Sequence, residues 1–146
     1  PSLVIFISCA MSGIIMETKM LKIIEDILIK AKSRYLLYIY NVIVSVITAG
    51  FGCNQSIAVI LTYNLIHNTY DSKGIDRHEL AVDIENTGIV IAPLIPWNIA
   101  ALVSTTTMGV SIMGYLPYAI YLYLIPIFNI IIYRFREAST LKFNQL

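Results

Sequence analysis

A stretch of 48 consecutive residues, from Asn86 to Tyr133, contains no aspartate, glutamate, lysine or arginine. Two further stretches, 1–16 and 35–70, are equally free of charged residues. About 20 predominantly apolar residues suffice to cross a bilayer, whereas soluble domains carry about 25% charged residues, against 13% in this chain. Because helices satisfy their own backbone groups in lipid, the sequence predicts an all-α integral membrane protein.

Several other function classes have little support in the composition. The net charge of +1 gives no electrostatic case for binding nucleic acid. Cys9 and Cys53 lie in apolar stretches and form neither a metal-ligand spacing nor a disulfide framework. We find no nucleophile–base pair, no Gly-rich phosphate loop and no metal cluster, so we expect neither an enzyme nor a cofactor.

The first 34 residues contain two different segments. Residues 1–16 are apolar but too few for a full span, and the chain opens with Pro1 inside this run. We therefore expect a truncated transmembrane helix, at the start of the C-terminal part of a longer protein. Residues 17–34 place apolar side chains at helical spacing with charges between them, which predicts an amphipathic helix in the membrane interface. The basic cluster at 30–34 marks the cytoplasmic side.

The next apolar run, 35–67, is long for a single crossing and has a small, polar middle. A crossing needs about 17–25 residues, and glycine in the middle permits a sharp turn. We predict a re-entrant hairpin with its tip near 50–55. Backbone of this kind is tolerated at membrane depth only where protein or a watery cavity surrounds it.

After a predicted polar loop over 68–82, proline interrupts the apolar run 83–108 at Pro93 and Pro96. Proline removes a backbone donor and disfavours helix at the residue before it. We therefore predict a discontinuous helix, with halves near 84–92 and 99–108, followed by a final tyrosine-rich span over 115–133 and a basic tail over 134–146. Two crossings and one hairpin place both basic clusters on the same side of the membrane. Either 35–67 or 83–108 satisfies this count as the hairpin, and the length and Gly-containing middle of 35–67 favour it.

Polar residues within apolar spans are costly and are functional candidates for that reason. They gather at the hairpin tip and at the broken helix, where half-helix ends and free carbonyls can coordinate sodium or anionic groups. The candidate ligands are Thr48, Asn54, Gln55, Ser56, Asn86, Thr87, Trp97 and Asn98, and the candidate proton carriers are Asp83 and Glu85.

A structural role stays open for each of these residues. Thr48 and Ser56 can bond to their own helices, and Trp97 can anchor the chain at the membrane interface. Asp83 and Glu85 can be solvated carboxylates at the start of a helix, where a negative charge is favourable.

The stretch Asp83–Asn98, DIENTGIVIAPLIPWN, resembles the signature of the NhaC-type Na+/H+ antiporter family, in which an acidic-Ser-Gly segment precedes Pro-Leu-Ile-Pro-Trp-Asn. Residues 52–61, GCNQSIAVIL, and 115–119, YLPYA, also fit the family pattern. The resemblance implies a bacterial inner-membrane secondary transporter that exchanges sodium for protons or, in some members, organic acids. It also implies paired inverted repeats, each with a re-entrant hairpin and an unwound helix, of which this chain would hold the C-terminal pair.

Two departures from the family bear on coupling. Asn86 and Asn54 stand where many members have an acidic residue. Asparagine can ligate sodium but carries no proton near neutral pH. Sodium-driven uptake of a solute therefore stays open beside antiport, as does a non-transporting remnant or assembly subunit. The expected partners are the lipid bilayer and the N-terminal half of the same transporter, with a homodimer left open.

Overall fold

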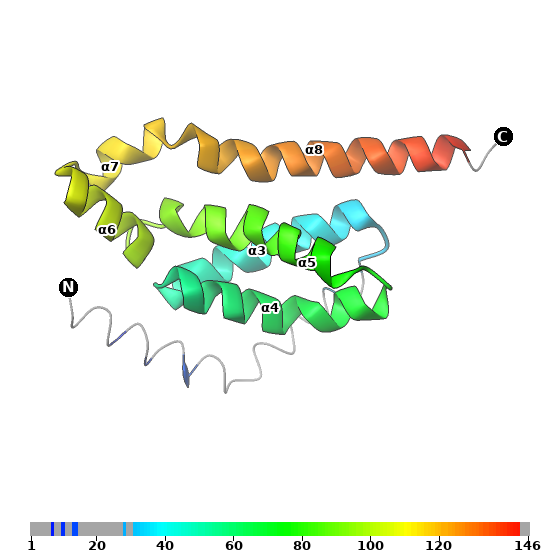
Figure 1. Ribbon diagram of the computed structural model, residues 1–146, viewed down its shortest axis with the longest axis horizontal. Helices are drawn as coiled ribbons and strands as arrows, with labels where there is room; N and C mark the ends of the chain where they lie inside the picture. The colour runs from blue at the N-terminus through cyan, green and yellow to red at the C-terminus, as the bar shows by residue number, and fades with distance from the viewer. Residues whose placement is uncertain (1–6, 8–9, 11–12, 15–27, 29–30, 144–146) are drawn as a thin grey trace.

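The computed structural model describes residues 7, 10, 13, 14, 28 and 31–143, with side chains placed as far as Ala138. The segments expected over 1–16 and 17–34 therefore lie almost entirely outside the described residues. The described part is helical (Figure 1). Its α-helices are α3 (Arg34–Gly52), α4 (Gln55–Ser72), α5 (Arg77–Ile84), α6 (Ile99–Met108), α7 (Ile112–Tyr115) and α8 (Ile120–Phe143).

Helices α3 and α4 form a tight antiparallel hairpin. Ser33 caps α3 by accepting from the Leu36 amide, and Asn54 caps α4 by accepting from the Ser56 amide at 2.9 Å. Cys53 ends α3 in the left-handed conformation, with φ of 48°. The turn falls within the expected tip, and the arms have 19 and 18 residues. The second arm, α4, extends beyond the predicted end of the hairpin at 67, because the polar residues up to Ser72 continue the helix.

The second half of the chain begins with a broken span. After α5, residues Glu85–Ile89 (η1) wind as a π-helix and Ala92–Leu94 (η2) as a 3-10 turn. The chain then leaves helical geometry until Asn98 caps α6 by accepting from the Ala100 amide. The two halves, Arg77–Leu94 and Ile99–Met108, are bent by 56°. Pro93 fits the start of the 3-10 turn, where no backbone donor is needed.

Two expected boundaries differ from the structure. Most of the loop expected over 68–82 is helical, since α4 continues to Ser72 and α5 begins at Arg77. Asp71, Arg77 and Glu79 lie on exposed sides of these helices, whereas Lys73 and Asp76 stay in the short connection between them. The final helix begins at Ile120, after a bend of 45° at the 3-10 turn Leu116–Tyr118 (η3), and it runs to Phe143 through the expected basic tail.

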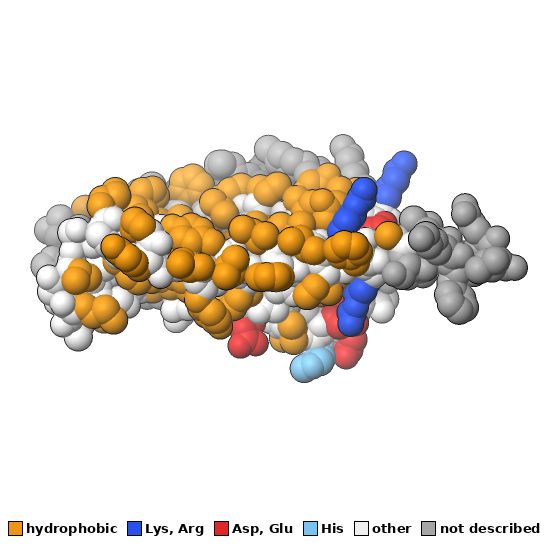
Figure 2. Space-filling model, turned by 90° about the horizontal axis from the view of Figure 1, so that it is seen from above, with side chains coloured by type: hydrophobic (Ala, Val, Ile, Leu, Met, Phe, Trp, Pro, Cys, Tyr) orange, Lys and Arg blue, Asp and Glu red, His pale blue; other side chains and the backbone are white. Residues whose placement is uncertain are grey.

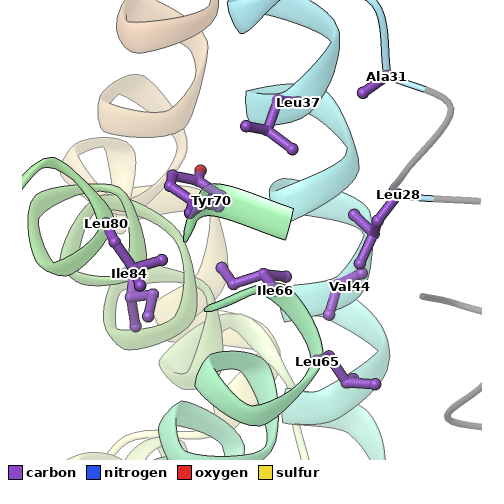
Figure 3. Close-up of a cluster of buried hydrophobic side chains, with 9 residues drawn as sticks. All are labelled: Leu28, Ala31, Leu37, Val44, Leu65, Ile66, Tyr70, Leu80 and Ile84. Carbon is purple, nitrogen blue, oxygen red and sulfur yellow. The ribbon is translucent and has the colours of Figure 1, made fainter. Parts of the chain in front are cut away.

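An apolar core joins the hairpin to the broken span. Its buried members come from α3, α4 and α5 and from the segment before α3: Leu28, Ala31, Leu37, Val44, Leu65, Ile66, Tyr70, Leu80 and Ile84 (Figure 3). Among the described residues, α3 is long and apolar enough to cross a membrane, and the total rises to three if each bent pair is one span. Figure 2 shows one face of the molecule, which is largely apolar and has most of its charged side chains toward one end.

Candidate functional site

A stripe of polar side chains runs along the buried face of α3. Its members follow one another at intervals of three or four residues, so they share one side of the helix: Arg34, Tyr38, Asn41, Ser45 and Thr48. All except Arg34 are buried, and Tyr38, Asn41 and Ser45 have no exposed surface. A buried polar row in an otherwise apolar helix is costly, so its partners on the other helices define the candidate site.

At the charged end of the stripe, Arg34 meets the buried carboxylate of Asp83. The guanidinium lies 2.6 Å from Asp83 Oδ2, and Asp83 is only 1% exposed. The Tyr70 hydroxyl donates to Oδ2 and the Tyr133 hydroxyl donates to Oδ1, each at 2.7 Å. This charge cluster, Arg34, Tyr70, Asp83 and Tyr133, therefore ties α3, α4, α5 and α8 together.

Arg34 is held in this cluster by further contacts. Its guanidinium donates to the hydroxyls of Tyr70 and Tyr133 and lies over both rings, 5.2 and 4.6 Å from their centroids. It also reaches Glu79 Oε2 at 3.4 Å. A pocket of about 370 Å³ opens beside the cluster, lined by Arg34, Glu79, Tyr133, Arg136 and Glu137. The charge cluster thus adjoins a pocket lined by charged side chains.

In the middle of the stripe, hydroxyl groups link α3 to the π-wound segment and to α4. Ser45 Oγ lies 3.0 Å from Thr87 Oγ1, which donates to the Asp83 carbonyl at 2.7 Å. Thr48 Oγ1 lies 2.7 Å from Thr62 Oγ1 of α4. A π-helix widens the backbone and often marks functional sites. Here it places Thr87 against Ser45, one turn beyond Asp83.

At the far end of α3, the helix break docks against the hairpin tip. Trp97 Nε1 donates to the Gly50 carbonyl at 2.8 Å, and Asn98 Nδ2 donates to the Ala49 carbonyl at 3.1 Å. The Ile99 amide donates to the Cys53 carbonyl at 2.8 Å. The last carbonyls of a helix lack intrahelical partners, so the break supplies the donors that the end of α3 requires.

Two helix N-termini meet beside this contact. Asn54 and Asn98 cap α4 and α6, and Gln55 Nε2 donates to the Ile89 carbonyl at the end of the π-wound segment. A second pocket of about 370 Å³ lies between them, lined by Asn54, Gln55, Ser56, Pro93, Ile99, Ala100, Val103 and Ser104. Helix N-termini carry partial positive charge, and the described pocket lining contains no charged residue.

The candidates from the sequence therefore divide among three places. Thr48, Thr87 and Asp83 lie on the buried stripe or against it. Asn54, Gln55, Ser56, Trp97 and Asn98 belong to the tip and break, where the side chains of all but Ser56 bond to backbone groups. Asn86 is half-buried, and Glu85 is exposed on an apolar groove that Arg77 also lines.

Sequence reasoning missed Arg34, Asn41, Ser45, Thr62, Tyr70 and Tyr133 as site residues. In the sequence Arg34 indicates only the cytoplasmic side of the membrane, and Tyr133 only marks the tyrosine-rich final span. The spacing of polar residues along 34–48 is the signal that identifies the α3 members.

The comparisons with known proteins agree with the resemblance in the sequence. The model of the Na+/H+ antiporter family matches residues 1–136. An uncharacterized Na+/H+ antiporter of Haemophilus influenzae is 28% identical over 119 residues, covering 81% of this chain and 25% of that protein. The Na+/H+ antiporter NhaC of Alkalihalophilus pseudofirmus is 25% identical over 132 residues, covering 87% of this chain and 28% of that protein.

A relative named for a different exchange reaction also matches. The malate-2H+/Na+-lactate antiporter of Bacillus subtilis is 30% identical over 78 residues, covering 53% of this chain and 17% of that protein. The chain spans about a quarter of the length of the first two relatives. No solved structure matches it significantly.

The family match places this chain in a family of membrane transporters, and its candidate membrane-spanning helices fit that class. The chain belongs to the Na+/H+ antiporter family, of the NhaC type.

Proposed function

We propose that this chain is part of a sodium-coupled secondary transporter that exchanges Na+ for H+ by alternating access. One observation carries the proposal: a buried row of hydroxyl and amide groups on α3 faces the π-wound turn of a broken helix. Ser45, Thr87 and the backbone carbonyl of Asp83 meet there, and all three residues are buried. Hard cations such as Na+ take oxygen ligands, and interrupted helices are where transporters supply them.

Asp83 is the better placed of the two candidate proton carriers. Its carboxylate is buried and adjoins the pocket that Arg34 and Tyr133 line. It accepts from three donors, the bonding role of an ionised carboxylate. Taking up a proton would remove the negative charge that Arg34 pairs with, so protonation at Asp83 would loosen α5 from α3. Glu85, which is exposed, stays a second candidate.

The tip and break would form the moving contact of this cycle. The bonds from Trp97 and Asn98 to α3 hold the hairpin tip closed against the broken span. Breaking them would free the Ala49 and Gly50 carbonyls together with Asn98 as sodium ligands. Thr48, Asn54, Gln55, Ser56, Asn86 and Thr87 complete the set that we assign to ion or substrate handling.

We also propose where this chain lies in the complete transporter and in the membrane. Helices α3 and α4 form a re-entrant hairpin in the C-terminal repeat of a multi-pass protein of the bacterial plasma membrane. The surrounding bilayer covers the exposed apolar side chains, such as Phe128 and Phe135. An N-terminal repeat of the same transporter completes the site. A homodimer is compatible with this arrangement.

A second candidate function is sodium-coupled exchange of an organic acid. The observation that favours it is the uncharged pocket between the N-termini of α4 and α6. Helix N-termini bind carboxylate groups. The relative named for malate and lactate exchange matches this chain at 30% identity over 78 residues. Under this proposal Ser56 and Ser104, which line the pocket, would contact the substrate carboxylate.

The test is ion flux in liposomes containing the complete polypeptide that carries these 146 residues. We expect an outward Na+ gradient to drive proton movement in the opposite direction. Asn98→Ala and Asn54→Ala should each raise the Na+ concentration needed for half-maximal flux, whereas Asn68→Ala, an exposed site on α4, should not. Unchanged sodium dependence in both tip variants would remove the tip from the ion site.

Two further results separate the alternatives. Proton flux that requires malate or lactate as well as Na+ would favour organic-acid exchange over simple antiport. If Na+ moves no protons and no organic acid in any orientation, the chain is a non-transporting subunit or remnant. The mass of the native protein, determined by blotting membranes with an antibody to 134–146, shows whether a heavier polypeptide carries the second repeat.

A further inference from the structure

The amide of Asn41 is a buried polar group whose bonding partners are incomplete. Asn41 has no exposed surface, and within the described residues its Nδ2 has no hydrogen-bond partner. Its Oδ1 lies 3.4 Å from Ser45 Oγ. An unpaired buried amide group is costly, and such a group in a native protein needs an explanation.

The direction of the neighbouring hydrogen bonds decides which amide atom is unpaired. Thr87 Oγ1 donates to the Asp83 carbonyl at 2.7 Å, so its single hydrogen is used there. Ser45 Oγ, 3.0 Å from Thr87 Oγ1, must therefore donate to Thr87. Ser45 then has no hydrogen left for Asn41 and can only accept from it.

This chain of donors fixes the orientation of the amide. Asn41 bonds to Ser45 only if its NH2 group faces the serine, which turns the amide by 180° and leaves Oδ1 as the atom without a donor. In this row Asn41 donates to Ser45, Ser45 donates to Thr87, and Thr87 donates to the Asp83 carbonyl. All three hydrogen bonds run in the direction away from Asn41 Oδ1. Linked hydrogen bonds polarise one another, so electron density accumulates on Asn41 Oδ1.

We propose that Asn41 Oδ1 is a ligand of the transported Na+, at a buried position midway along α3 between the Arg34–Asp83 pair and the hairpin tip. A polarised amide oxygen without a donor suits a dehydrated cation, as carbonyl oxygens do in ion pathways. The Tyr38 hydroxyl, one turn closer to Asp83 on the same face, is also fully buried and lacks a partner among the described residues. It continues the path toward the charge cluster.

This assignment rests on the proposed sodium-coupled function, so its test measures sodium binding separately from transport. The complete polypeptide is purified, and its melting temperature is followed as Na+ replaces choline at constant ionic strength. A ligand that binds the folded state raises the melting temperature with concentration. Asn41→Ala should raise the half-saturating Na+ concentration about tenfold or more. Asn129→Ala, which removes a half-buried amide bonded to its own helix at Ile125, is the matched control.

Asn41→Asp keeps an oxygen at the same place and adds negative charge, so it should retain Na+ binding at a half-saturating concentration no higher than that of the wild type. A wild-type response to Na+ in Asn41→Ala would overturn the assignment and leave an ordered water beside Asn41, with the transport proposal intact. Failure of both Asn41 variants to fold would also overturn it, because the amide would then be a structural group. Absence of any Na+-dependent flux or stabilisation in the wild type would remove the proposed function itself.

Discussion

Arg34 and Asp83 are 49 residues apart in the chain, yet the guanidinium of one lies 2.6 Å from the carboxylate of the other. Asp83 is buried, and the side chain of Arg34 is only 22% exposed. Buried ion pairs are weak contributors to stability when intact, but removing one partner leaves an uncompensated charge. The pair therefore fixes how the broken span lies against α3.

Substituting one partner of this pair should destabilise the fold strongly. We expect Arg34→Ala to lower the free energy of unfolding by about 3 kcal/mol or more, measured as heat or denaturant unfolding in detergent. Arg34→Met combined with Asp83→Leu should recover much of that loss. Arg134→Ala, at an exposed arginine over the Tyr35 ring, is the control. Equal stability of the Arg34→Ala and Arg134→Ala proteins would contradict the prediction.

The Tyr133 hydroxyl should hold α8 against the rest of the bundle. Tyr133→Phe removes one hydrogen bond to the buried carboxylate, and bonds to charged groups contribute about 1.5–3 kcal/mol. We expect faster amide hydrogen exchange along α8 in this variant. Tyr121→Phe, at a tyrosine that is 69% exposed on the same helix, should leave exchange unchanged. Identical exchange in the two variants would show that α8 is held by other contacts.

Adding a methyl group at Gly52 should destabilise the hairpin, whereas adding one at Gly50 should not. A Cβ on Gly52 would lie 3.2 Å from the backbone nitrogen of Ala58, whereas a Cβ on Gly50 meets nothing within 4 Å. Because backbone cannot yield as a side-chain end can, Gly52→Ala should lower the melting temperature. Gly50→Ala should be neutral or slightly stabilising, since alanine favours helix. The opposite order would mean that the two arms separate easily.

The contact between break and tip can be followed through Cys53, whose carbonyl accepts from the Ile99 amide. In a Cys9→Ser background, Asn98→Ala should speed the reaction of Cys53 with a small polar thiol reagent, because it removes both the helix cap and the bond to Ala49. Asn98→Asp keeps the cap and should have an intermediate effect. Sodium should slow the reaction in the parent protein. A Cys53 reaction rate that changes neither with the Asn98 substitutions nor with sodium would indicate a purely structural contact.

Much of the architecture could be predicted from the sequence because charge and proline placement constrain it directly. The charge-free runs locate the apolar helices, the Gly-containing segment near 50–55 locates the hairpin turn, and Pro93 and Pro96 locate the break. Helix ends were harder. Polar residues such as Asp71 lie on the exposed side of the last turns of α4. In the sequence, such a polar helix end has the same composition as a loop.

The candidate site was only partly predictable because it depends on which faces of the helices meet. Asp83 and Thr87 were identifiable as polar residues beside the break. That Tyr133 would reach Asp83 depends on how α8 crosses α3 and η1, which no local pattern records. Arg34 belongs to the basic cluster at 30–34, and the positive-inside rule already explains a basic residue there. Nothing in the sequence therefore indicates that its side chain turns inward to pair with Asp83.

The hairpin tip and the helix break are capped by neutral side chains alone, Asn54 and Asn98, and the stretches 35–70 and 86–133 carry no formal charge. Moving a unit charge through a membrane potential involves about 2.3 kcal/mol per 100 mV. Displacement of the tip against the break therefore moves no charged side chain through the membrane field. Apart from the partial charges of the helix ends, voltage sensitivity at this end of the molecule would come from the ion that it carries.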